Sequence, residues 1–202
     1  MPPKRELTKE RILDGAFDFV RVNGFDALTA RSITQFLQCS TQPVYSVFGS
    51  IDGLKKAVYE RTAEFAGSRM KEYQNRDNAS ALNLAIGFLL FAKDEKQLFR
   101  TLYLSGYKTY DPKSELLLGE ELTTSHMRFS KRLHSATAPL IKSLFLKLSI
   151  YLIGIGTMMN SGTLELGIDE AKEMVTEMYE MLLTKEGLNN TGSRTGGQGS
   201  EG

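Results

Sequence analysis

The sequence predicts an all-α fold, and two observations lead to that prediction. Apolar residues recur at every third or fourth position in one segment after another, which is the period of a helix with one buried face. No segment sustains the strict alternation of apolar and polar residues that is typical of a half-buried strand. The 202 residues, 41% of them hydrophobic, are enough to bury a core. We therefore expect about nine helices, separated by recognisable helix stop signals.

The clearest stretch begins with a short helix from about residue 30 to residue 37. Thr29 is a good N-cap for it, because a threonine hydroxyl can accept a hydrogen bond from a backbone amide one turn further on. The residues expected to be buried on this helix are Ile33, Phe36 and Leu37.

A second short helix follows a polar joint at Gln38-Cys39-Ser40, and either Ser40 or Thr41 is expected to cap it. Its predicted buried face consists of Val44, Val47 and Phe48. Its predicted exposed face consists of Thr41, Gln42, Tyr45 and Ser46. The two segments form a helix-turn-helix, whose small polar side chains could meet base edges and phosphates in a DNA major groove. The alternative, a helix-turn-helix used only for packing, is disfavoured because residues 29–51 contain Arg31 and no acidic residue.

The order of residues from Ser40 to Leu54 resembles the TetR family of bacterial transcriptional regulators. The positions that match the family pattern here are Tyr45, Phe48, Ser50, Asp52 and Leu54. The resemblance extends over about residues 6–66 and implies an N-terminal three-helix DNA-binding unit followed by a helical ligand-binding and dimerisation domain.

Three positions depart from the family pattern. Gln38 replaces the usual glycine of the turn, so this residue must take a left-handed conformation or the turn must differ. Val47 stands where the family often has histidine or tyrosine, and Ile51 stands where it often has lysine. Lys55 or Lys56 would then have to replace that lysine in contacting a phosphate.

We expect the DNA contacts to come from the start of the first short helix, from the second helix and from the helix after it. We expect Tyr45 to contact a phosphate, with Thr41, Gln42 and Ser46 nearest the bases. The expected DNA-binding residues are Thr29, Ala30, Arg31, Ser40, Thr41, Gln42, Pro43, Tyr45, Ser46 and Lys55. The chain carries a formal charge of only +1, so binding should depend on local contacts and on two copies acting together.

The rest of the chain predicts further helices and four regions in all. The expected later helices cover about residues 51–74, 80–92, 94–110, 114–135, 139–162 and 168 onward. The regions are a helix-turn-helix domain at 1–50, a linking helix and loop at 51–78, a regulatory and dimerisation domain at 79–186, and a disordered tail at 187–202. The tail is expected because it is rich in glycine and has almost no apolar side chain.

Aromatic and methionine side chains are dense in the C-terminal part. Ordinary core packing explains most of them, although some could line a small-molecule cavity. In the TetR family a pocket between the middle helices binds an inducer, so the resemblance implies a small-molecule effector. The candidate pocket residues are Phe88, Phe91, Phe99, Tyr103, Tyr107, Met127, Tyr151 and Met158.

Two helical faces suggest a homodimer. The last helix has an apolar seam at Ile168, Ala171, Val175, Met178 and Leu182. The preceding helix has a stripe of small residues at Gly154, Thr157 and Ser161. Both faces could instead pack only within one chain. The resemblance favours a four-helix dimer interface.

Other functional classes find little support. The two histidines lie eight residues apart without other ligands at metal-binding spacing, so we expect no metal site and read them as surface or pocket-edge residues. No phosphate-binding loop or nucleophile elbow is present, so we expect no cofactor and assign no catalytic residue. A single cysteine fits a reducing cytosol, and the apolar stretch 148–164 is short and diluted by polar residues, so we expect a cytoplasmic protein without a membrane partner.

These observations and the resemblance together favour a homodimeric regulator of transcription that binds double-stranded DNA. As a repressor, it would occupy a palindromic operator and be released by a small-molecule ligand. The alternative from another class is an all-α carrier of apolar small molecules with a vestigial DNA-binding unit.

Overall fold

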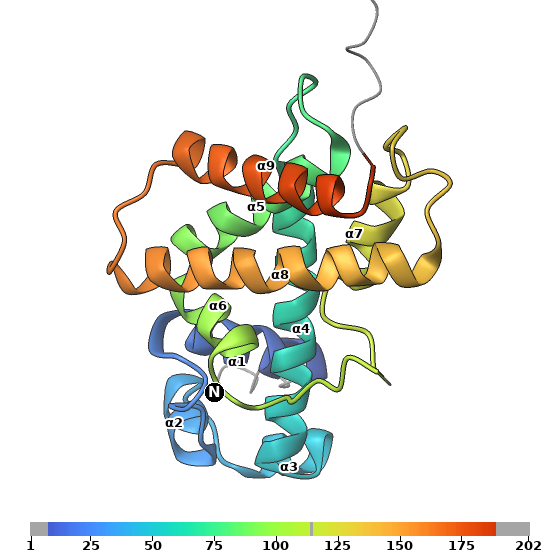
Figure 1. Ribbon diagram of the computed structural model, residues 1–202. Helices are drawn as coiled ribbons and strands as arrows, with labels where there is room; N and C mark the ends of the chain where they lie inside the picture. The colour runs from blue at the N-terminus through green and yellow to red at the C-terminus, as the bar shows by residue number, and fades with distance from the viewer. Residues whose placement is uncertain (1–7, 114, 189–202) are drawn as a thin grey trace, which may run out of the picture.

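The computed structural model describes residues 8–113 and 115–188, which form nine α-helices and no strand (Figure 1). The all-α prediction is confirmed. The helices are α1 (Lys9–Asn23), α2 (Ala30–Phe36), α3 (Gln42–Phe48), α4 (Ile51–Glu72), α5 (Ser80–Asp94), α6 (Lys96–Tyr103), α7 (Glu120–Met127), α8 (Ala138–Ser161) and α9 (Ile168–Lys185).

The first three helices lie together at one end of the molecule (Figure 1). Thr8 caps α1 by accepting a 3.3 Å hydrogen bond from the Arg11 amide, and Gly24 ends the helix with a φ of 87° that favours glycine. The buried side of α1 packs on α4, and Ile12 and Val20 are fully enclosed there. Helix α1 therefore contacts both α4 and α2, while α3 packs on α4 directly.

Helix α4 connects this unit to the remaining helices (Figure 1). Ser50 caps it by accepting a 3.0 Å hydrogen bond from the Gly53 amide. Near its other end, α4 crosses α5 in close backbone contact, because a Cβ atom at Gly87 would collide with the Met70 carbonyl group. Helix α4 therefore has close contacts both with α3 and with α5.

Helix α5 lies behind α8 and α9 in the view of Figure 1, and α8 and α9 run side by side. One hydrophobic core continues from α1 through α4, α5 and α6 to α8 and α9. A second, smaller core gathers around Met127, Leu133, Phe145 and Leu183. By length and composition α8 could cross a membrane, but it packs against α5, α7 and α9 here, so this is weak evidence of a span.

Two expected helices are shorter than predicted. Helix α6 ends at Tyr103, and the chain then turns at Gly106, whose φ of 66° favours glycine. The helix predicted over 114–135 is reduced to α7, which follows Gly119 in a left-handed conformation. After α7, turn hydrogen bonds such as Leu133 amide to Ser130 carbonyl replace helical ones. These turns place Leu133 in the smaller core.

The first two residues of the tail predicted at 187–202 lie within the described part of the chain. These residues, Gly187 and Leu188, close α9, since the Leu188 amide donates a 2.9 Å hydrogen bond to the Leu183 carbonyl. The Leu188 carbonyl also accepts a 2.8 Å hydrogen bond from Arg132 Nε. The rest of the predicted tail, 189–202, lies outside the described residues.

Candidate DNA interface and ligand cavity

The start of α2 is fixed by a reciprocal pair of hydrogen bonds. The Ser32 amide donates to Thr29 Oγ1 at 3.1 Å, and the Thr29 amide donates to Ser32 Oγ at 2.9 Å. This capping box satisfies two amides that would otherwise lack a helical partner. The hydroxyl of Thr29, an expected DNA contact, therefore also holds the end of α2 in place.

The turn between α2 and α3 accommodates the missing glycine by placing Gln38 in the left-handed region, with a φ of 51°. The Cys39 amide then donates a 3.0 Å hydrogen bond to the Thr34 carbonyl, which closes the turn. Burial raises the pKa of the Cys39 thiol. A raised pKa disfavours the reactive thiolate, so this cysteine is suited to packing in the turn.

Helix α3 separates a buried face from an exposed polar face. Val44 is fully buried, and Val47 and Phe48 are half-buried against the same core. The exposed residues are Thr41, Gln42, Tyr45 and Ser46. Thr41 occupies the N-cap position, but its side chain makes no capping hydrogen bond. The four polar side chains expected to contact DNA thus share one exposed surface.

The remaining expected DNA-binding residues surround this surface. Arg31 and Ser40 are exposed, whereas Ala30 and Pro43 are half-buried. The ammonium group of Lys55 lies over the Phe25 ring, 5.6 Å from its centroid.

Lys56 and Phe36, also in the helix-turn-helix region or next to it, differ in their surroundings. Lys56 is exposed, and its ammonium lies 4.0 Å from the Glu60 carboxylate. Phe36 was expected to be buried but is 50% exposed, because α2 is short and the ring packs only edge-on against Phe19.

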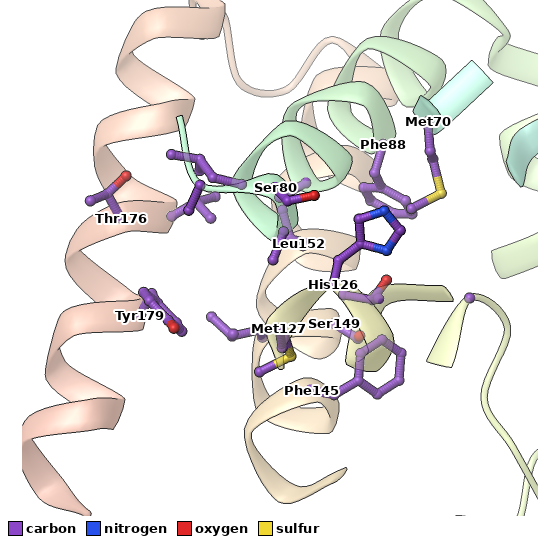
Figure 2. Close-up of a pocket in the computed structure, with 18 of the residues that line it drawn as sticks. Met70, Ser80, Phe88, His126, Met127, Phe145, Ser149, Leu152, Thr176 and Tyr179 are labelled. Atoms are coloured by element: carbon purple, nitrogen blue, oxygen red, sulfur yellow. The ribbon is translucent and has the colours of Figure 1, made fainter. Parts of the chain in front are cut away.

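A cavity of about 330 Å³ lies among α5, α7, α8 and α9 (Figure 2). Its walls are mainly apolar and aromatic. The lining includes Met70, Leu82, Phe88, Tyr103, Leu117, Leu118, His126, Met127, Phe145, Leu152, Val175 and Tyr179. Met70 belongs to α4, so the connecting helix contributes to the wall.

Several polar side chains also face this region. The Nδ1 atom of His126 lies 2.8 Å from the Leu122 carbonyl, a hydrogen bond within α7. The Glu180 carboxylate accepts hydrogen bonds of 2.7 and 2.9 Å from Arg132 Nη1. Burial raises the pKa of the Tyr103 phenol and also that of Tyr179, so both phenols stay uncharged at neutral pH.

Three of the eight expected pocket residues line this cavity: Phe88, Tyr103 and Met127. Phe91 and Phe99 lie instead in the close-packed core, where each is within 6.5 Å of a neighbouring ring. The other three lie elsewhere: Tyr107 packs on Phe25 in the loop after α6, Tyr151 packs against the main core, and Met158 is exposed on α8.

Several lining residues, such as Met70, Phe145 and Tyr179, were not among the expected pocket residues, and His126, interpreted as a surface or pocket-edge residue, also lines the cavity. Its helix, α7, was placed within a longer one, so no periodic pattern assigned it an inner face. Among the described residues no group of three potential metal ligands comes together.

The seam expected to join two chains is largely used within one chain. Ala171 and Val175 are buried in the main core, because α9 packs on α5 with this face. Leu182 packs against the smaller core, and Ile168 packs partly buried against the main core. Met178 is half-buried.

The small residues of α8 lie differently. Gly154 and Ser161 are exposed, and nothing lies within 4 Å of the position a Cβ atom would take at Gly154. Thr157 is half-buried and donates a 2.7 Å hydrogen bond to the Ile153 carbonyl. Exposed apolar side chains accompany them, namely Ile150 and Met158 on α8 and Met181 on α9. The exposed apolar side chains therefore lie mainly on the outer side of α8, with Met181 on α9, and not on the predicted seam.

No protein-family model matches the chain, and no curated protein matches it. Among solved structures, the chain shares its fold with a TetR-like regulator. That structure is a TetR-like transcriptional regulator from Rhodococcus sp. RHA1, which is 18% identical, with a TM-score of 0.60 and coverage of 90% of this chain and 98% of that chain. The TetR resemblance noted in the sequence is thereby confirmed at the level of the fold.

Proposed function

We propose that this protein is a DNA-binding regulator of transcription whose α3 helix enters the major groove. The observation that carries the proposal is the exposed surface of α3, where four polar side chains lie together in a segment without acidic residues. Hydroxyl and amide groups on such a surface can read base edges, and Tyr45 can reach a phosphate. The shared fold with a TetR-like transcriptional regulator supports the proposal.

The proposed active form is a homodimer joined through the outer sides of α8 and α9. Exposed Ile150 and Met158 supply apolar surface, and Gly154 between them allows a second helix to approach closely. A two-fold dimer would place its two α3 helices on half-sites about 34 Å apart, which predicts a palindromic operator. Two copies also compensate for the nearly neutral charge of the chain.

We further propose that a small molecule in the cavity lowers operator affinity. One connection runs through α4, because Met70 lines the cavity and the same helix begins at Ile51, directly after α3 ends at Phe48. A second runs through the loop after α6. Leu117 and Leu118 in this loop line the cavity. Tyr107 in the same loop packs on Phe25, which follows α1, with the two ring centroids 5.0 Å apart.

Such a ligand must bind the DNA-incompetent arrangement more tightly than the competent one. A coupling free energy of about 1–3 kcal/mol would then lower operator affinity roughly 5- to 150-fold. In this proposal residues 1–50 bind DNA, 51–78 link, and 79–186 bind the effector and dimerise. We propose that the protein acts as a repressor in the cytoplasm, where it occupies its operator until the ligand releases it.

The cavity supports a second candidate function, a carrier of apolar small molecules that no longer uses its DNA-binding unit. An enzyme is disfavoured, because the carboxylate of Glu180, which lines the cavity, is already paired with Arg132 and is thereby less suited to act as a general acid or base. Retention on DNA at moderate salt distinguishes the regulator from the carrier.

The decisive experiment is to select bound sequences from random double-stranded DNA and to test whether they are two-fold symmetric. The proposal expects a symmetric consensus that the wild type binds and a Gln42→Ala/Tyr45→Ala variant does not. Both residues are exposed, so the variant should fold normally and serves as the matched control. Recovery of no consensus, with a folded dimeric protein, would favour the carrier.

A further inference from the structure

The size and lining of the cavity restrict what it can hold. Its volume of about 330 Å³ is roughly twice that of the apolar cavity of about 150 Å³ that accommodates one benzene molecule. Aromatic rings from Phe88, Tyr103 and Phe145 and the sulfur atoms of Met70 and Met127 contribute to its walls. Rings and thioethers pack favourably against aromatic molecules. An aromatic ligand of about two rings fits both properties.

The charges around the cavity favour an uncharged ligand. Glu180 at the wall is already neutralised by Arg132, through hydrogen bonds of 2.7 and 2.9 Å. Lys142 on α8 lies 3.6 Å from the buried Glu120 carboxylate. An anionic ligand would have to take a cation from one of these pairs or draw a proton onto His126, and a cationic ligand would have to displace Arg132. An uncharged ligand requires none of these changes.

His126 supplies one polar group at the wall that a ligand can use. Its Nδ1 atom lies 2.8 Å from the Leu122 carbonyl, which can only accept, so Nδ1 carries the proton and donates. In the uncharged ring, Nε2 is then an acceptor. In Figure 2 this far end of the ring is directed toward Met70 and Phe88, neither of which can donate a hydrogen bond. Within the described residues Nε2 has no hydrogen-bond partner, so a ligand donor can supply one.

We infer that the cavity binds an uncharged aromatic molecule of about two rings that carries a hydroxyl group, and that this hydroxyl donates a hydrogen bond to His126 Nε2. The inference rests on the proposed function only for its consequence, which is that this molecule acts as the effector. Binding itself is independent of whether the protein recognises DNA.

The test compares naphthalene derivatives that differ in one group. Because the chain has no tryptophan, naphthalene fluorescence can report binding without a protein indole background. Wild type should bind 2-naphthol about tenfold more tightly than 2-methoxynaphthalene, which keeps the oxygen but lacks the donor. It should bind 2-naphthoate more weakly than either, because the carboxylate must be desolvated and finds a counter-charge only if His126 takes up a proton or an existing ion pair is broken.

Two variants locate the donor contact. His126→Leu should bind 2-naphthol and 2-methoxynaphthalene equally, since the acceptor is gone. His134→Leu is the matched control, because His134 Nδ1 makes a similar 2.9 Å contact with the Lys131 carbonyl but does not line the cavity. This variant should keep the tenfold preference. The comparison of ligands on the wild type remains valid even if a variant folds poorly.

Each outcome decides a separate question. Equal binding of the naphthol and its methyl ether by the wild type, tightest binding of the naphthoate, or no binding of any derivative would overturn the inferred ligand class. DNA selection on the same preparation without ligand tests the proposed function alone. If 2-naphthol binds with the expected preference but leaves operator affinity unchanged, the ligand class stands and the effector role fails.

Discussion

Glutamate substitutions at two positions on α8 and α9 should have opposite effects on folding and on association. Ile150 on α8 is 63% exposed in the single chain, whereas Ala171 on α9 is fully buried in the main core. We expect Ile150→Glu to give a folded monomer and Ala171→Glu to give a protein that folds poorly. The two variants therefore test whether the outer side of α8 serves association while the seam of α9 serves folding of the single chain.

The expected magnitudes follow from burial. At Ile150 the single chain should change in stability by no more than about 0.5 kcal/mol, as at other exposed sites. In the proposed dimer, loss of one buried isoleucine costs about 2 kcal/mol, and two-fold symmetry repeats that loss in the partner. A total of about 4 kcal/mol corresponds to roughly a thousandfold increase in Kd.

At Ala171 the added side chain enters a closely packed apolar region. Overpacking alone costs about 1–3 kcal/mol, and a carboxylate without a partner adds several more. Since the free energy of unfolding of a domain of this kind is only about 5–15 kcal/mol, this substitution removes most of it. The protein should then unfold at much lower temperature, whatever its concentration.

Sedimentation velocity at micromolar concentration and thermal unfolding measure the two effects. Val22→Glu is the matched control, because Val22 is 75% exposed on α1 and lies far from the proposed interface in sequence. This variant should remain dimeric and stable. A dimer that persists in Ile150→Glu, or a wild type that is monomeric at this concentration, would refute the proposed interface.

Three further predictions concern DNA reading, packing and coupling. Gln42→Ala should change base preference in the selected site by about 1–3 kcal/mol, whereas Tyr45→Phe should weaken all sequences similarly, as measured by titration of labelled duplexes. Gly87→Ala should lower the free energy of unfolding in urea by about 1–3 kcal/mol, because its Cβ would lie 2.8 Å from the Met70 carbonyl carbon. Gly67→Ala, where nothing lies within 4 Å, should instead stabilise α4 by about 0.5–1 kcal/mol. Tyr107→Ala should leave ligand affinity unchanged but reduce the ligand's effect on operator binding, and an unaltered effect would exclude the loop after α6 from the coupling.

The N-terminal helices could be predicted from sequence because their boundaries are set by local chemistry. Thr8, Thr29 and Ser50 each cap a helix through a hydrogen bond that spans three residues. Gly24 and Gly49 each take a positive φ at the end of a helix. Such signals need no knowledge of the rest of the fold, so the positions of α1, α2 and α3 follow from them.

The segment around α7 was predicted less well because its conformation depends on distant contacts. Glu120 at the start of α7 is buried, accepts a 3.1 Å hydrogen bond from the Leu117 amide and pairs with Lys142 on α8. Leu133 is drawn into the smaller core beside Leu183 of the last helix. These interactions shorten a segment whose own residues would allow a longer helix, and no local pattern encodes them.

The residues that line the cavity could not be predicted from the sequence either. A cavity forms where side chains of several helices leave space between them, and this depends on how the helices pack. Phe88, Phe91 and Phe99 have the same apolar character, and Phe99 packs on both of the others, but only Phe88 of the three lines the cavity. Periodicity identifies which residues of a helix avoid water. It does not identify which of them face another side chain and which face a space.

The apolar surfaces of α8 and α9 differ in whether they indicate a second copy of the chain. The α9 seam is satisfied within one chain by α5, so a heptad-like pattern there does not require a partner. Helix α8 differs, because only 22% of the residues in its most apolar stretch are buried within the chain. The open position at Gly154 beside exposed Ile150 and Met158 suits close contact with another helix. A two-fold dimer covers this surface with the same surface of a partner, which makes the outer side of α8 the place where dimerisation should be tested.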